Sequence, residues 1–110
     1  MADPGHLRIV HSAALERYEA ILTTDSTDVV DADEIVVGYV DYVSEPYQVV
    51  LTHTVIPEAY SGRGYAGRLV RAVLDDIRGT GKRIVPVCSY VQHFIEQNPE
   101  YADMAVPVPQ

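Results

Sequence analysis

The residues best suited to hold a ligand lie in the stretch YSGRGYAGRLVRAVLDDIRG, which begins at Tyr60. It has three glycines within six positions, Gly62, Gly64 and Gly67, directly ahead of a regular apolar pattern. Glycine allows the backbone to turn tightly and to approach another group closely. The first turn of a helix offers unpaired N–H donors and the positive end of the helix dipole. Together they predict an anion site, with phosphate as the favoured ligand; glycines that merely shape the start of the helix are the alternative.

Two other side chains are candidates for group-transfer chemistry, and each has a structural alternative. Histidine is the natural general base near neutral pH, and His53 is predicted to share a strand face with Leu51 and Val55, turned toward an apolar side. A buried histidine that only hydrogen-bonds a neighbour would fit the same pattern. Cys88 precedes a predicted helix, whose N-terminus favours the nucleophilic thiolate. A small buried hydrophobic residue is the alternative for this cysteine.

A series of strands must position these residues. Segments rich in Val, Ile and Tyr have the alternation and composition of strands. They are residues 7–11, 15–23, 34–43 and 48–56. The sequence SEPY between the last two predicts a turn, so they should form an antiparallel hairpin. The acidic segment 23–34 lacks the ligand pattern and the glycine of a calcium loop, so we expect a solvated turn and no metal site.

Two helices are predicted in the second half of the chain. Apolar residues recur at helical spacing over 66–77, and Gly79 and Gly81 are predicted to end this helix. The second helix is expected over 89–97, with Ser89 as its N-cap.

A short strand is predicted between the helices, over residues 82–88. Pro86 within it cannot donate to a sheet ladder, so one side of this strand must be an edge, a bulge or a gap. Residues 101–110 are predicted to be a loose tail. The order of elements differs from that of a dinucleotide-binding fold, and the loop lacks the Lys and Ser/Thr of a P-loop.

Length and charge limit the classes of protein. The 110 residues suit one hydrophobic core, so a single domain over 1–110 is predicted. The formal charge of -8 argues against nucleic acid and favours a small or cationic partner. Apolar runs are far too short to cross a bilayer. The start of the sequence lacks the features of a signal peptide, and a lone cysteine excludes an internal disulfide, so we expect a cytoplasmic protein.

The motifs HTVIPEAYSGRGYAGRLV and IVPVCSYVQHFIEQNPEY, in this order of elements, resemble the GNAT N-acetyltransferase superfamily. More narrowly, they resemble its very small single-domain members, which have a His before the loop and a Cys after the next strand. The resemblance is strongest from Val49 to Tyr101. It implies an α+β fold with a mixed, mostly antiparallel sheet, whose strands splay apart beside the Gly-rich loop and helix. It also implies acetyl-coenzyme A (acetyl-CoA) as a substrate and transfer of acetyl to an amine.

The resemblance implies which residues meet coenzyme A. The superfamily's loop reads Gln or Arg, two variable residues, Gly, one variable residue, then Gly or Ala. Here Gly64 and Ala66 match, whereas Ser61 replaces the first residue. His53 is implied to lie beside the acetyl group, and Cys88 either carries the acetyl transiently or stands by while the acceptor attacks directly. The expected coenzyme contacts are Val55, Gly62, Arg63, Gly64, Tyr65, Ala66, Gly67 and Asn98.

The acceptor site is expected to be open. Residues 12–14 between the first two strands are too few for the helices that help to wall this site in larger members. The expected acceptor is a small cationic amine or a protein lysine, with a homodimer as one way to complete the site. Tyr90 and Tyr101 are core or wall residues, unless one of them protonates the departing thiolate. A coenzyme A-binding module without efficient turnover and a non-enzymatic interaction domain are the alternative functions.

Overall fold

A computed structural model describes residues 5–24 and 33–106 of the chain. Most of the acidic segment lies outside these ranges, so the solvated turn stays a prediction. The strands are β1 (Gly5–Ser12), β2 (Arg17–Thr24), β3 (Asp33–Ser44), β4 (Gln48–Val55) and β5 (Arg83–Pro86). The helices are α1 (Tyr65–Thr80) and α2 (Ser89–Gln97), with short 3-10 helices η1 (Glu58–Tyr60) and η2 (Pro99–Met104).

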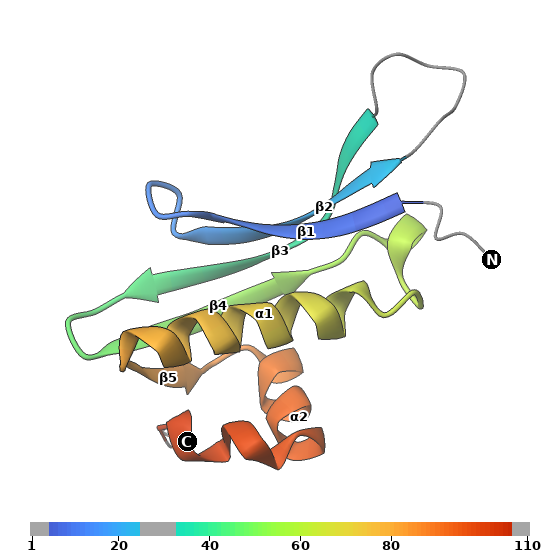
Figure 1. Cartoon of the computed structure of the whole chain (residues 1–110). Coiled ribbons are helices and arrows are strands. Elements are labelled where there is room, and N and C mark those ends of the chain that lie inside the picture. Colours follow the sequence, from blue (N-terminus) through green and yellow to red (C-terminus); the bar gives the residue numbers. More distant parts are fainter. Residues whose placement is uncertain (1–4, 25–32, 107–110) are drawn as a thin grey trace.

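The strands form one mixed sheet in the order β1-β2-β3-β4-β5 (Figure 1). Neighbouring strands from β1 to β4 are antiparallel. Short turns connect β1 to β2 and β3 to β4. The pair β4–β5 is parallel, because α1 carries the chain back across the sheet between them. The expected α+β class, the mostly antiparallel sheet and the hairpin before the glycine loop are therefore confirmed.

The predicted apolar stripe of α1 packs against one face of the sheet. Its buried residues are Leu69, Val70, Val73, Leu74 and Ile77. They meet sheet residues such as Val40 and Leu51, which are fully buried. Burial of each such aliphatic side chain stabilises the fold by about 1.5–3 kcal/mol. Ala66, the first member of the predicted stripe, is half-buried and turns toward a pocket instead.

The strands β4 and β5 separate where the proline was expected to mark a gap. They pair from Gln48 opposite Arg83 to Leu51 opposite Pro86, after which the Cys88 N–H still donates to the Leu51 carbonyl at 2.9 Å. Beyond that contact β4 continues to Val55 beside β3, while the segment after β5 turns into α2. The splayed strands are thus present, and Pro86 is the last residue of the paired segment.

Three local predictions need correction. Gly79 lies within α1, and Gly81 ends the helix in a left-handed conformation with φ 79°. Cys88, not Ser89, is the N-cap of α2, because its extended backbone precedes the first helical residue. The expected loose tail is packed up to Val106, whose N–H donates to the Ile84 carbonyl at 2.8 Å. The hydrophobic side chains of Tyr101 and Met104 explain this packing, because both are buried.

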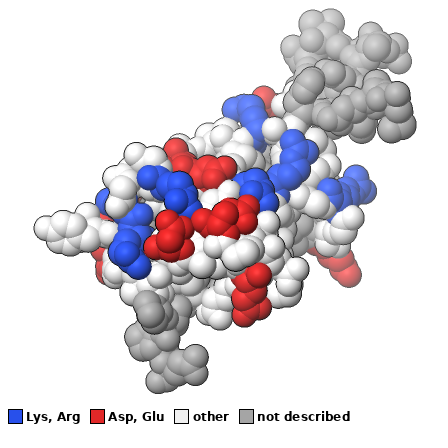
Figure 2. Space-filling view, turned by 60° about the horizontal axis from the view of Figure 1, so that its bottom comes forward, with Lys and Arg blue, Asp and Glu red and all other residues white. Residues whose placement is uncertain are grey.

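Polar contacts fix η2 against α1. The guanidinium of Arg71 lies 3.3 Å from the Glu100 carboxylate, and that of Arg78 lies 3.1 Å from Asp103. Figure 2 shows acidic and basic side chains interleaved on the face that it displays, not gathered by sign. None of the described helices is long and apolar enough to span a membrane.

Candidate functional site

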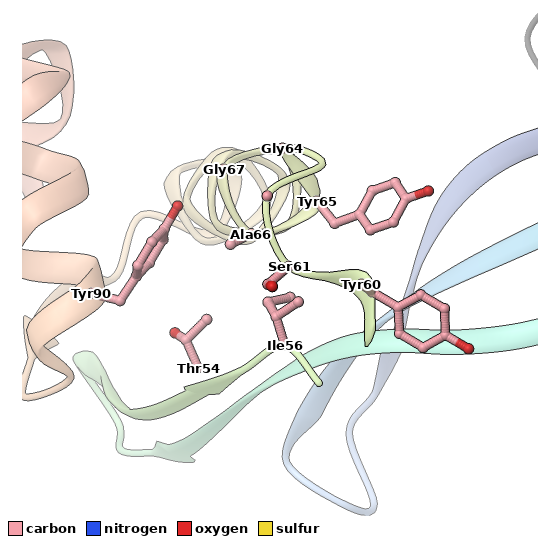
Figure 3. Close-up of a pocket in the computed structure, with 10 residues that line it drawn as sticks. Thr54, Ile56, Tyr60, Ser61, Gly64, Tyr65, Ala66, Gly67 and Tyr90 are labelled. Atoms are coloured by element: carbon pink, nitrogen blue, oxygen red, sulfur yellow. The ribbon is translucent and has the colours of Figure 1, made fainter. Parts of the chain in front are cut away.

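A pocket of about 440 Å³ lies where β4 ends and α1 begins (Figure 3). Its walls come from the end of β4, the loop after it, the first turn of α1 and the first turn of α2. The lining residues are Thr54, Ile56, Tyr60, Ser61, Gly62, Gly64, Tyr65, Ala66, Gly67 and Tyr90. Five of the predicted coenzyme contacts, Gly62, Gly64, Tyr65, Ala66 and Gly67, are therefore brought together around one cavity.

The glycines in this loop have different physical roles. Gly62 and Gly64 have φ of 77° and 81°, in the left-handed region where a side chain is strained. Gly67 has no such φ, and a Cβ there would lie 3.9 Å from the Tyr90 hydroxyl oxygen, an ordinary contact. The backbone turn therefore requires glycine at two positions, while Gly67 keeps the space between α1 and Tyr90 open.

The N-terminus of α1 faces the pocket with its donors available. Gly64 is the N-cap and has no side chain to accept from the first turn. The first hydrogen bond of the helix runs from the Arg68 N–H to the Gly64 carbonyl at 3.2 Å. The N–H groups of Tyr65, Ala66 and Gly67 precede it and are the orphan donors of a helix start. With the helix dipole, they can bind an anion.

The Tyr90 hydroxyl is a hydrogen-bond donor at the opposite wall. In Figure 3 its ring extends from α2 toward Gly67. Burial raises the pKa of Tyr90, so its phenol stays protonated at neutral pH. The Ser61 hydroxyl, within the loop, donates to the Glu58 carbonyl at 2.9 Å and so holds η1 in place.

A β-bulge in β4 decides which side chains reach the pocket. Asp41 pairs with His53 but the next residue, Tyr42, pairs with Leu51, so Thr52 is the extra residue. The bulge shifts the alternation of side chains by one position. Thr54 therefore lies on the pocket side of the strand.

The prediction that His53 faces the apolar side is wrong. It assumed unbroken alternation from Leu51, whereas the bulge turns His53 to the face opposite α1, opposite Asp41 in register. His53 is exposed and does not line the pocket. Asp41 itself is paired with Arg17 at 2.6 Å, and the Arg17 guanidinium lies 3.9 Å from the centre of the Tyr39 ring. The catalytic role of His53 stays a prediction.

Cys88 is adjacent to the pocket but not part of its wall. It is half-buried at the N-terminus of α2. Its thiol donates to the Thr54 hydroxyl, with 3.3 Å between Sγ and Oγ1. Because Thr54 lines the pocket, the thiol is one side chain away from the cavity.

A second cluster of polar residues surrounds a cavity of about 100 Å³ beside the distal half of α1. The Tyr18 hydroxyl donates to Asp76 at 2.5 Å, and the His11 ring stacks on Tyr18 with 4.1 Å between centroids. His11 also contacts the Tyr42 hydroxyl. These contacts tie β1, β2 and β3 to α1, which gives the cluster a structural role. Within residues 5–24 and 33–106, no group of three His, Cys, Asp or Glu side chains is placed so that it could hold a metal ion.

The sequence profile of the GCN5-related N-acetyltransferases matches residues 27–104, most of the chain and all of the pocket. The chain belongs to this family. A GCN5-like protein from Staphylococcus aureus, whose structure was determined by NMR in solution, has a similar fold. The two align with a TM-score of 0.64 at 17% identity, over 94% of this chain and 91% of that one.

Curated relatives of this chain match over a shorter region. Protein NATD1 of Bos taurus is 43% identical over 51 residues, and the proteins of the same name from Gallus gallus and Mus musculus are 39% identical over 51 residues. The matches cover 46% of this chain and 45% or 46% of each relative. The chain therefore spans about half the length of the curated relatives it matches.

Three predicted coenzyme contacts of this family member lie outside the pocket lining, and their role stays a prediction. Arg63 is exposed beside the glycine loop, and Val55 lies on the face opposite α1. Asn98 accepts from Arg71 at 2.8 Å and donates to the Phe94 carbonyl at 2.9 Å. These bonds give Asn98 a structural role in joining η2 to the two helices.

Sequence reasoning missed Thr54, Ile56 and Tyr60 as lining residues. The β-branched Thr54 and Ile56 look like ordinary strand residues, and only the bulge brings them to the pocket side. Tyr60 is the last residue of η1, which is too short to show a repeating pattern of apolar residues in the sequence. In Figure 3 the Tyr60 and Tyr65 rings extend to the same side of the loop, away from Thr54 and Tyr90.

Proposed function

We propose that this protein binds acetyl-CoA in the pocket and transfers the acetyl group to an amine. One observation carries the proposal: the uncapped N-terminus of α1 and the gap between β4 and β5 border the same cavity. Acetyl-CoA, the general acetyl donor of the family, has a pyrophosphate for the helix N-terminus and a slender arm for the gap. The fit of acetyl-CoA is supported by Gly62 and Gly64, because a Cβ at either position would meet nothing within 4 Å and the backbone is therefore open to a ligand.

Backbone groups would do most of the phosphate binding. The N–H groups of Tyr65, Ala66 and Gly67 point out of the first turn of α1, where the helix dipole favours negative charge. Arg63 and Arg68 are exposed nearby, and neither forms an ion pair with another described residue. Their charges are available to the phosphates.

Acetyl-CoA would supply a thioester carbonyl, which a neutral amine attacks while the carbon–sulfur bond breaks. Beyond Leu51, the β5 side of β4 has no strand partner in residues 33–106, so backbone N–H groups there are suited to polarise the carbonyl. Tyr90 is suited to protonate the departing sulfur, because it lines the cavity and a phenol carries its proton at neutral pH. We therefore propose Tyr90 as the tyrosine that protonates the thiolate. Tyr101 is less suited, because its hydroxyl donates to Asp75 at 2.7 Å.

The acceptor would approach from the face opposite α1. His53 is exposed on that face, one residue from Thr54 of the pocket wall, so the two side chains flank β4 from opposite sides. His53 would take the proton that the attacking amine loses, and Tyr90 would give one to the coenzyme thiolate. Exchange with solvent returns both groups to their starting state.

A relay through Cys88 is the second route. The thiol would exchange with the thioester, giving an acetylated Cys88 and coenzyme A with the thiol proton. An amine would then attack the acetyl-cysteine and restore the thiol. The hydrogen bond to Thr54 supports this route by orienting the thiol at the pocket wall.

A cationic amine or a lysine side chain of a protein remains the proposed acceptor. The formal charge of -8 favours the approach of a cation. None of the ten lining residues is acidic, so the pocket itself has no carboxylate to hold the charged amine. Recognition of the acceptor would thus depend on the face opposite α1, where Glu19 and Asp41 share a side with His53.

A coenzyme A-binding module without efficient turnover is the rival function, and one observation favours it. The pocket lining includes no histidine, carboxylate or thiol, so the general base must act from outside the cavity. The discriminating experiment is to follow free coenzyme A thiol with acetyl-CoA and either spermidine or a lysine-containing peptide. Transfer predicts thiol release that depends on the amine, together with an acetylated product by mass spectrometry. Binding of acetyl-CoA without amine-dependent release would establish the rival.

A further inference from the structure

Gly38 on β3 leaves a notch in the sheet that the Ile56 side chain fills. A Cβ placed on Gly38 would overlap the δ-methyl of Ile56 and would lie 3.1 Å from the Val55 carbonyl oxygen. The overlap is far inside any real carbon–carbon contact, so a side chain at position 38 would displace Ile56. The carbonyl contact is also tighter than usual and involves backbone, which yields less easily than a methyl group.

The backbone conformation does not explain this glycine. Gly38 is absent from the described glycines with positive φ, unlike Gly62 and Gly64. It lies beside the register shift at which Ala20 pairs with Gly38 but Ile21 pairs with Val36. Glycine within a strand weakens it and commonly marks a close approach of another group. Here the approaching group is Ile56.

Ile56 connects the notch with the pocket. Its side chain lines the cavity, and Figure 3 shows Ile56 beneath Ser61 at the end of β4. The loop that follows is short and folded tightly, because the Tyr60 N–H donates to the Pro57 carbonyl at 2.9 Å. The Ser61 N–H also donates to the Glu58 carbonyl at 3.1 Å. The place where Ile56 is anchored therefore sets where this loop meets α1.

We propose that Gly38 is a positioning residue for the coenzyme site. It never touches the ligand and acts by holding Ile56 in the notch, which fixes one pocket wall and the start of the glycine loop. This role at the pocket rests on the proposed function, because it presumes that acetyl-CoA occupies the cavity. A side chain at position 38 would turn the Ile56 methyl group out of the notch toward the cavity.

The test compares Gly38→Ala with Gly38→Ala/Ile56→Val. Alanine at position 38 should weaken acetyl-CoA binding about tenfold by isothermal titration, and shift the amide NMR signals of Ser61 to Gly67. Valine at position 56 removes the overlapping methyl, and the next Ile56 atom, Cγ1, is an ordinary 3.5 Å from the added Cβ. Because Ile56 itself lines the pocket, the reference for the double variant is Ile56→Val alone. The double variant should recover most of the affinity and the amide positions of that reference, and the 3.1 Å contact with the Val55 carbonyl is the difference that remains. Gly79→Ala is the matched control, since its Cβ would meet nothing within 4 Å.

Each outcome decides the proposal. Wild-type affinity and amide signals in Gly38→Ala would overturn it, as would an undiminished defect in the double variant relative to Ile56→Val alone. A lower unfolding midpoint with unchanged affinity would reveal a purely structural glycine. If the wild type itself does not bind acetyl-CoA, the proposed function fails, and the amide signals alone decide whether the notch positions the loop. If Gly38→Ala does not fold, Ile56→Ala empties the notch from the other side and must shift the same signals.

Discussion

The thiol of Cys88 donates a hydrogen bond to the Thr54 hydroxyl across the gap between β4 and β5, with 3.3 Å between Sγ and Oγ1. Thr54 comes from the pocket wall and Cys88 from the N-terminus of α2. The contact thus joins the chain's sole cysteine to the cavity at the point where the strands separate. It makes the relay through Cys88 testable separately from coenzyme binding.

Replacing Cys88 by alanine should separate binding from covalent transfer. The variant removes the thiol but no residue of the pocket lining, so its affinity for acetyl-CoA should be unchanged. If Cys88 carries acetyl, intact-mass spectrometry after incubation with acetyl-CoA should find an adduct of one acetyl group in the wild type and none in Cys88→Ala. An adduct of equal yield in the variant would exclude Cys88 as the carrier.

Substitutions of Gly64 should separate backbone strain from ligand exclusion. Its φ of 81° means that Gly64→Ala should lower the free energy of unfolding by about 1–2 kcal/mol. Gly64→Glu adds a carboxylate that would face the phosphates, so acetyl-CoA binding should be lost. Both effects can be measured by urea unfolding and isothermal titration, with Gly79→Ala as the control. Unchanged affinity in folded Gly64→Glu would show that the phosphates bind elsewhere.

Replacement of His53 should affect chemistry more than binding. Because His53 is exposed on the face opposite the pocket, His53→Ala should leave the affinity for acetyl-CoA at its wild-type value. If it is the general base, kcat should fall by roughly 10²-fold or more. The rate should then rise with pH, as a larger fraction of the amine becomes neutral. A kcat equal to that of the wild type would remove His53 from the mechanism.

The buried tyrosines should make stability fall in alkali. Burial, and secondarily the hydrogen bond to Asp76, raise the pKa of Tyr18 well above its ordinary value. Only the unfolded state then loses this proton readily above pH of about 10, so the stabilisation is complete below that pH and declines as pH rises. Urea unfolding between neutral pH and pH of about 11 should show a shallower decline in Tyr18→Phe than in the wild type. Tyr47→Phe, at a position 86% exposed, should leave the decline unchanged.

Local signals in the sequence were enough to predict most of the fold. Helical spacing of apolar residues identified α1, and Pro86 marked the separation of β4 and β5 because proline cannot continue a ladder. The glycines Gly62 and Gly64 were recognisable because a tight turn before a helix requires positive φ. Each of these signals acts within a few residues of the feature that it predicts.

The side-chain directions around the pocket could not be predicted in the same way. The bulge at Thr52 depends on pairing with β3 and reverses the directions of His53 and Thr54, with no local residue pattern to announce it. The packing of Tyr101, a residue of η2, against α1 and α2 also depends on long-range contacts, including the bond from Arg71 to its hydroxyl at 3.2 Å. Such contacts between distant segments decide the site geometry.

The central claim is that the N-terminus of α1 holds coenzyme A. The most direct measurement is a thermal-shift titration of the wild-type protein with acetyl-CoA, coenzyme A and ATP in parallel. Ligand at one hundred times its dissociation constant should stabilise by about 2.7 kcal/mol, which raises the unfolding midpoint by several degrees. The account predicts such a shift with both coenzyme species and little with ATP. No shift with either coenzyme species, in protein shown to be folded, would contradict it.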